Sequence, residues 1–527
     1  MTANDASTRP NGYSTTMGAV KRSNGTVAAK QNGSHAIDLQ IWKRLVQCLP
    51  PRTADCDFWW MLTGRHLAIM LEEAGASVGE QYAALTFHYH WVIPRMGPKP
   101  GADGVIPGRW KSLLQADGTP IEYSWKWNTS RGQPAIRYAM EPIGEYAGTE
   151  LDPLNQQATR QALHQLSQAF PETNLEWTNH FFSTLFDHDS TKLAQEDAAG
   201  AKLTTSTGIG VDFGVNGIAF KTYFQGRKLN QPGFMPLEDW IAAMQPLLSE
   251  EGEMSTEGAL GAFLDFLNSN PHGQPLKPFS LAVDCVSPEK SRLKLYMNTP
   301  RTSFASVRAI MTLGGRFSGD LVEKQLRDIR ELLYGVLGVP EDFPDDAEIE
   351  QTYHQKALLA ETASAAPGTG PGMSRRRSSG SSNGTKTPPP AHTPGFVYYF
   401  DVAKGQALPK VKFNIPVRSY GRDELATAKA VVDFMEARGR GAYGASFLRA
   451  LEGLASGMGG SAPKALDQTR GQQSFIGLDL SSSGELGVTS YMAVRGSDAI
   501  EGLERAGSSY FKPIRGTRRR DESYYEV

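Results

Sequence analysis

The chain has 527 residues, of which 40% are hydrophobic and 21% charged, as in a folded globular protein. Its 54 Lys and Arg against 56 Asp and Glu give a net charge of −2, which excludes a global basic surface for nucleic acid. Three cysteines are too few for a disulfide framework and fit a reducing compartment. No apolar run approaches the ~20 residues of a membrane span, and no signal-peptide pattern is evident, so we expect a cytoplasmic protein.

Three segments have compositions that predict disorder. Residues 1–36 are rich in Ser, Thr, Asn and Gly, 362–394 contain an Arg triplet and a Pro triplet, and 513–527 form a charged tail. Such segments cannot bury enough apolar surface to offset the entropy lost on ordering. We therefore expect a single domain over 37–512, interrupted by an insert at 362–394.

Five β-hairpins are predicted by pairs of segments in which apolar and polar residues alternate, joined by turn residues. In chain order the pairs are 119–127 with 135–141, 208–214 with 218–224, 279–286 with 291–297, 396–402 with 411–417, and 474–480 with 485–492. The second pair is joined through Asn216-Gly217, which is the strongest short-range hairpin signal.

Two stretches with helical periodicity precede each hairpin. They are 58–74 and 79–92, 152–170 and 175–186, 236–248 and 258–267, 302–313 and 320–337, and 423–438 and 444–454. The unit of two helices and two strands thus occurs five times. Ten antiparallel strands can close into a barrel that leaves no exposed edge. We expect an α+β fold in which helices surround a ten-stranded antiparallel β-barrel.

One face of the predicted strands carries cations. Alternate residues of a strand share a face, so Arg292, Lys294 and Tyr296 lie together, opposite two leucines. If the apolar faces pack against outer helices, the polar faces line the lumen of the barrel. The cations expected to converge there are Arg137, Lys221, Arg292, Lys294 and Lys412.

A lumen of this kind suits a diphosphate, because Arg and Lys donate charge-assisted hydrogen bonds. Tyrosines among the cations could surround a carbocation with their π faces. The alternative is a half-solvated sheet whose Lys and Arg face water, and recurrence in four of the five hairpins disfavours it. His88 and His90 are interpreted as packed or capped histidines, since no third metal ligand is evident.

Six short stretches resemble, in their order and spacing, the fungal aromatic prenyltransferases of the dimethylallyl-tryptophan synthase family. They are 58–64, 120–124, 136–138, 220–224, 291–296 and 412–417, within a match that spans about 40–495. The resemblance implies an ABBA-type barrel of five ααββ repeats and a metal-independent enzyme with dimethylallyl diphosphate as co-substrate. Its partners would be this donor and a small aromatic acceptor, and we expect a monomer or a homodimer.

The resemblance also implies roles for single residues. Glu122 is similar to the family's catalytic, acceptor-binding glutamate, which accepts a hydrogen bond from the aromatic nucleophile, and we expect the lumen cations to keep it ionised. The five cations named above fall at diphosphate-binding positions. The carbocation shield would comprise Tyr223, Tyr296 and Tyr491. Asn414 and Phe475 stand where other members have shield tyrosines.

One departure bears on the acceptor. Tryptophan-using members have a Lys at the start of the second hairpin, where this chain reads Ser206-Thr207-Gly208. Residues 87–97 and 124–127 most resemble the branch that acts on polycyclic aromatic polyketides. We therefore expect dimethylallyl transfer to an aromatic carbon of such an acceptor in secondary metabolism. The alternatives are an indole prenyltransferase, acting on tryptophan, a cyclic dipeptide or an indole diterpene, and a non-catalytic barrel that binds anionic aromatic ligands.

Overall fold

The computed structural model describes residues 37–108, 110–115, 117–185, 189–193, 195, 203–214, 217–230, 235–248, 258–351, 395–455, 465–469 and 471–496. The segments predicted to be disordered, at 1–36, 362–394 and 513–527, lie outside the described residues, as does Asn216 of the second predicted turn. The described residues from Leu39 onward form one compact unit, which contains the barrel and its helices.

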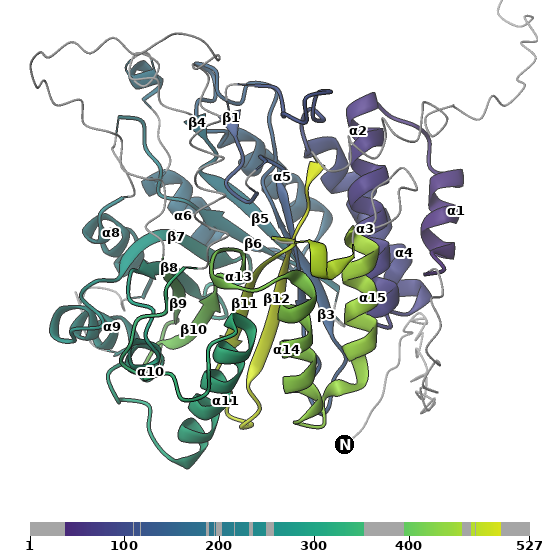
Figure 1. Ribbon diagram of the computed structural model, residues 1–527. Helices are drawn as coiled ribbons and strands as arrows, with labels where there is room; N and C mark the ends of the chain where they lie inside the picture. Colours follow the sequence, from purple (N-terminus) through teal and green to yellow (C-terminus); the bar gives the residue numbers. More distant parts are fainter. Residues whose placement is uncertain are drawn as a thin grey trace, which may run out of the picture. The chain divides into compact units, whose positions relative to one another are not determined.

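Ten antiparallel strands close into a barrel, in the order β10-β11-β12-β2-β3-β5-β6-β7-β8-β9 (Figure 1). They are β2 (Ile121–Lys126), β3 (Ala135–Met140), β5 (Thr207–Gly214), β6 (Gly217–Phe224), β7 (Lys277–Asp284), β8 (Leu293–Thr299), β9 (Phe396–Val402), β10 (Lys410–Ile415), β11 (Gln473–Asp479) and β12 (Gly487–Ala493). A separate parallel pair joins β1 (Trp110–Lys111) to β4 (Leu203–Thr204). The predicted barrel and its five hairpins are confirmed.

Helices lie around the outside of the barrel (Figure 1). They are α1 (Gln40–Cys48), α2 (Ala54–Trp59), α3 (Arg65–Glu73), α4 (Val78–Phe87), α5 (Gln157–Ala169), α6 (Glu176–Leu185), α8 (Leu237–Leu248), α9 (Gly258–Ser269), α10 (Phe304–Met311), α11 (Asp320–Leu337), α13 (Val417–Tyr420), α14 (Glu424–Glu436) and α15 (Gly444–Ala455). Sequence periodicity missed α1 and α13. Within the described ranges, no helix is long and apolar enough to cross a membrane.

Two predicted helices are interrupted by π-helical turns, which periodicity cannot reveal. The turns are η1 (Trp60–Gly64), between α2 and α3, and η2 (His88–Val92), after α4. They are joined by a buried hydrogen bond of 2.8 Å between Thr63 Oγ1 and His88 Nε2. Tyr123 of β2 donates from its hydroxyl to the carbonyl of Thr63, at 2.7 Å. Burial lowers the pKa of His88 to about 3, so this histidine is a neutral packing residue, as expected.

The barrel is apolar outside and polar inside. On β2, the side chains of Ile121, Tyr123 and Trp125 are buried beneath the helices. The ring of Trp125 contacts that of Phe447 on α15, with centroids 5.6 Å apart. Because alternate residues of a strand face opposite sides, this outward packing directs Glu122 and its face of β2 into the lumen.

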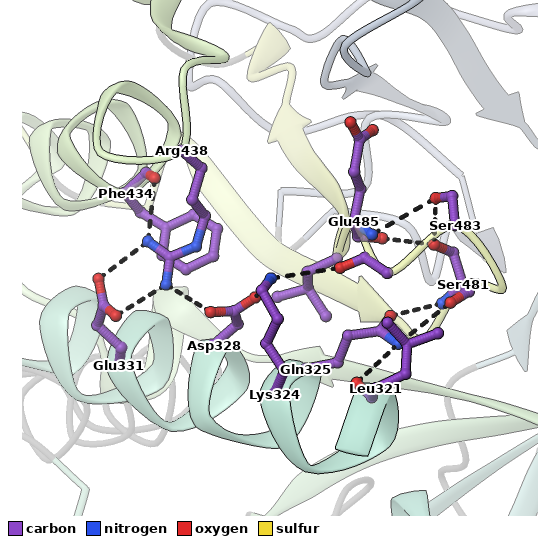
Figure 2. Close-up of polar contacts among 12 residues, drawn as sticks. Leu321, Lys324, Gln325, Asp328, Glu331, Phe434, Arg438, Ser481, Ser483 and Glu485 are labelled. Carbon is purple, nitrogen blue, oxygen red and sulfur yellow. Dashed lines mark hydrogen bonds and ion pairs between the residues drawn. The ribbon is translucent and has the colours of Figure 1, made fainter. Parts of the chain in front are cut away.

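Helix α11 fixes the turn between β11 and β12 (Figure 2). The backbone N–H of Ser481 donates to Gln325 Oε1 at 2.7 Å, and Gln325 Nε2 donates to the carbonyl of Ser481 at 3.1 Å. Gln325 is buried, whereas its neighbour Lys324 is half exposed and pairs with Asp328 at 3.2 Å. The paired amide bonds position the end of β11, where Asp479 lies.

We expect Gln325→Ala to lower the free energy of unfolding by about 1–3 kcal/mol, because it leaves partly buried backbone groups of Ser481 without their partners. Arg327→Ala changes an exposed side chain on the same helix and should cost less than about 1 kcal/mol. Urea denaturation of both variants measures the difference. Equal losses would show that the amide pair does not hold the turn.

Candidate active site

Seven neighbouring strands, β5 to β11, carry aspartate and lysine in strict alternation on their lumen faces. In strand order these residues, here called the charged ring, are Asp212, Lys221, Asp284, Lys294, Asp401, Lys412 and Asp479. The register places Lys221 opposite Asp284, Lys294 opposite Asp401, and Lys412 opposite Asp479. Opposite charges on neighbouring strands attract, whether they lie directly opposite or on the diagonal, so the ring orders its own side chains.

Two arginines extend the charged ring. Arg292 makes a 2.8 Å ion pair with Asp284 and a 3.0 Å ion pair with Asp401. Arg137 Nε lies 3.6 Å from Asp212 Oδ1. Their side chains are 41% and 36% exposed, respectively, so both guanidinium groups remain accessible within the lumen.

The lysines of the ring are held more tightly. Lys294 Nζ lies 2.6 Å from Asp284 Oδ1, and Lys221 pairs with Asp212. Lys412 donates to Thr489 at 3.2 Å and lies 3.9 Å from Asp479. The structure therefore brings all five predicted cations together, each with a carboxylate partner.

Sequence reasoning missed the four aspartates. Each lies near the end of a strand that leads into a hairpin turn, where aspartate is an ordinary turn residue. Their spacing could have revealed them, because each aspartate lies an even number of residues from the other lumen-facing residues of its strand. Sequence reasoning considered only cations on these faces and therefore overlooked the aspartates.

Burial and pairing set the ionisation of the ring. Burial alone would raise the pKa of Asp284, but Lys294 and Lys221 outweigh it and hold the pKa below its ordinary value. Asp212 behaves in the same way beside Lys221 and Arg137. Burial lowers the pKa of Lys294 to about 8, although Asp284 opposes the shift. Lys294 is thus still protonated at neutral pH and loses its charge at moderately alkaline pH.

A layer of aromatic rings lies next to the charged ring. On β6, β8 and β9, a tyrosine lies two residues farther from the hairpin turn than the charged residue: Tyr223 beyond Lys221, Tyr296 beyond Lys294, and Tyr399 beyond Asp401. The ring centroids of Tyr296 and Tyr399 are 5.1 Å apart, and those of Tyr223 and Tyr296 are 6.4 Å apart. Burial raises the pKa of all three tyrosines well above its usual value, so they remain neutral.

Tyr491 approaches the same region from β12, and its hydroxyl accepts a 3.4 Å hydrogen bond from Lys412. Phe475 lies opposite Tyr491, with ring centroids 6.4 Å apart, and Asn414 also faces the lumen. Sequence reasoning missed Tyr399, because Tyr398 and Tyr399 are adjacent and only the strand register shows which of them faces inward.

Glycines make room for the large lumen side chains. A Cβ atom at Gly477 would lie 2.6 Å from Lys412 Cε and 2.8 Å from Asn414 Oδ1. At Gly210 it would lie 3.0 Å from the ring of Tyr223. This pairing of small with large residues fills a narrow barrel without overpacking it.

Glu122 lies on the far side of the aromatic layer from the charged ring. On β2, Lys126 is nearest the hairpin turn, Ser124 is opposite Tyr491, and Glu122 comes next on the same face. A bulge in β11 turns Ser474 toward it, and Ser474 Oγ donates to Glu122 Oε1 at 2.6 Å. A shifted register of this kind cannot be read from sequence.

The lumen cations expected to keep Glu122 ionised are not among the groups that shift its pKa. Burial raises the pKa of Glu122, and the groups that oppose this shift are Ser474 and Arg418. Arg418, on α13, also donates to Gln115 Oε1 at 2.7 Å. Sequence reasoning extended the strand to 417 and so overlooked the short helix that carries this arginine.

Comparison with known proteins identifies the family. The model described as tryptophan dimethylallyltransferase matches residues 55–450. The prenyltransferase anuH of Penicillium roqueforti is 42% identical over 486 residues, which is 92% of this chain and 98% of that protein. Xanthone prenyltransferase A of Emericella nidulans is 41% identical over 437 residues, covering 82% of this chain and 91% of that protein.

The fold agrees with this assignment. The crystal structure of AnaPT from Neosartorya fischeri superimposes with a TM-score of 0.66 at 24% identity, covering 87% of this chain and 98% of that one. At this level of identity the likeness concerns the barrel alone. Together with the sequence matches over most of its length, it shows that the chain belongs to the tryptophan dimethylallyltransferase family of prenyltransferases.

Proposed function

We propose that the protein transfers a dimethylallyl group from dimethylallyl diphosphate to an aromatic carbon of a polycyclic, polyketide-type acceptor. The observation that carries the proposal is the order of groups along one lumen: charged ring, aromatic layer, then Glu122. Two relatives named xanthone prenyltransferases, 41% and 40% identical, support the acceptor class.

The five predicted cations bind the diphosphate in this proposal. Arg137 and Arg292 present accessible guanidinium groups to the diphosphate. The three lysines, Lys221, Lys294 and Lys412, complete the site from neighbouring strands. Their carboxylate partners hold them in place before the donor arrives. Preorganised cations in a partly water-free site stabilise the charge that develops on the departing diphosphate.

Ionisation breaks the C–O bond of the donor, and the bonding electrons leave with the diphosphate. The allyl cation then lies beside Tyr223, Tyr296 and Tyr491, to which we add Tyr399. The raised pKa of Tyr223, Tyr296 and Tyr399 keeps these phenols neutral, so their π faces stabilise the cation without reacting as phenolates. The layer also keeps water away from the cation.

Glu122 accepts a hydrogen bond from the acceptor's O–H and increases the electron density of its ring. The aromatic carbon forms a bond to the allyl cation, and the arenium intermediate then loses a proton. Burial raises the pKa of Glu122 and so makes it a stronger base than a solvated carboxylate. Ser474 fixes its orientation.

We further propose that residues 37–512 fold as one catalytic domain, in the cytoplasm, as a monomer or a homodimer. The lysines of the charged ring, together with Arg137 and Arg292, supply the positive charge that a metal ion would otherwise bring to a diphosphate. We therefore propose that transfer requires no metal.

Incubation with labelled dimethylallyl diphosphate and a panel of polycyclic phenols and indoles tests the proposal, with products read by mass spectrometry. We expect C-alkylated phenols, formed equally well in EDTA. Products from indoles alone would contradict the acceptor class. Loss of more than about 90% of turnover on chelation, restored by magnesium, would contradict the binding of the diphosphate by side chains alone.

Glu122→Gln keeps the size of the side chain but removes its charge. We expect turnover to fall roughly 10²–10³-fold with donor affinity unchanged, because the lost interaction strengthens in the transition state. Arg292→Ala should instead weaken donor binding with every acceptor. Single-turnover rates and donor affinities for both variants make the comparison. Normal turnover by Glu122→Gln would exclude it as the acceptor's partner.

Donor binding should depend on the charge of Lys294. The protonated lysine binds the diphosphate, so affinity should be highest below its pKa of about 8 and should fall as the pH rises through that value. Lys294→Arg should remove this fall, because arginine remains charged. Titration calorimetry with pyrophosphate from about pH 6 to pH 10 measures both proteins. Parallel pH profiles would contradict the role of Lys294.

A further inference from the structure

Lys126 is a lumen cation that is not among the five predicted diphosphate ligands. It is the last residue of β2 and shares the inward face with Glu122 and Ser124. The register places it opposite Ala135 on one side and Thr489 on the other, at the level of the charged ring. Its side chain is partly accessible.

Lys126 differs from the other cations in its partners. Within the described parts of the chain, no carboxylate lies within ion-pair distance of its ammonium group. Asp212 and Asp479 attract it from a distance. Both of these carboxylates are already engaged, Asp212 by Lys221 and Asp479 by Lys412.

The neighbours of Lys126 include two like charges. Burial lowers its pKa, and the positive charges of Arg137 and Lys412 lower it further. The free protein therefore holds this ammonium group at an electrostatic cost. A bound anion would remove that cost, because it would attract the three cations together.

A balance of charges shows what Lys126 adds. The charged ring and the two arginines contain five cations and four carboxylates, a surplus of one positive charge. Lys126 raises the surplus to two. Lys410, exposed at the outer end of β10 and opposite Asp401, adds a further positive charge at the rim. A diphosphate carries more than one negative charge, so Lys126 adds to the attraction from within the lumen.

We propose that Lys126 is a sixth diphosphate-binding residue and supplies positive charge that the aspartates of the ring leave unmatched. The inference rests on the proposed function of the charged ring. It assigns to β2 two roles at opposite ends of one face: Glu122 binds the acceptor, and Lys126 binds the leaving diphosphate. The same strand would then fix the distance between the two reactants.

Binding of inorganic pyrophosphate to the full-length protein tests this role without any acceptor. Titration calorimetry should show about 10- to 100-fold weaker binding by Lys126→Met, and near-normal binding by Lys126→Arg. Lys429→Met makes the same change on the exposed face of α14 and should bind normally. Arg292→Ala serves as the reference for a weakened donor site.

Thermal unfolding separates this role from a structural one. Removal of an unmatched cation should leave the Tm of the ligand-free Lys126→Met protein unchanged or higher, while the rise in Tm caused by pyrophosphate shrinks. A lower Tm with normal pyrophosphate affinity would overturn the inference. Should the Met variant fail to fold, Lys126→Gln applies the same test with a polar side chain.

The outcomes also separate this inference from the proposed function. Weak binding by Arg292→Ala with normal binding by Lys126→Met would overturn the role of Lys126 and leave the donor site intact. Absence of pyrophosphate binding by the unchanged protein would overturn both.

Discussion

The charged ring depends on one constraint: cations can be held inside a barrel only if carboxylates partly neutralise them. An isolated charge that leaves water is costly, and an unmatched cluster of cations would also repel itself. The alternation of aspartate and lysine from β5 to β11 meets this constraint. Lys221 and Lys294 pair diagonally with the aspartates of their own hairpins, and Lys412 lies opposite Asp479. Arg137 and Arg292 give the site a surplus of positive charge, which is available to an incoming diphosphate.

Strand geometry converts this ring into an ordered site. Successive lumen positions on one strand are two residues apart, roughly 6.6 Å along the strand. The lumen therefore has three levels along its axis. The charged ring forms the first, the tyrosines form the second, and Glu122, on β2, lies at the third. In the proposed reaction, the C–O bond that breaks joins the diphosphate at the first level to the allyl group at the second. The C–C bond that forms joins the allyl group to the acceptor at the third level. Outer helices pack on the opposite faces and keep this register fixed.

Much of this arrangement could be predicted from the chain. Two-residue alternation located all ten strands, and helical periodicity located most helices, because both patterns report burial directly. Alternation also placed Lys294 and Tyr296 on one face. What could not be predicted depends on contacts between distant segments: the bulge that brings Ser474 to Glu122, the ion pairs of the aspartates, and the approach of Arg418 from α13. Burial of Glu122 likewise emerges only when the barrel closes.

A crystal structure with a thiolodiphosphate analogue of the donor would show directly which level of the lumen holds the diphosphate. We predict that it lies at the level of the charged ring, contacting Arg137 and Arg292, with the allyl group beside Tyr296 and directed toward Glu122. A diphosphate at the opposite end of the lumen, near Arg418, would contradict this arrangement, because the acceptor carboxylate and the donor site would then coincide.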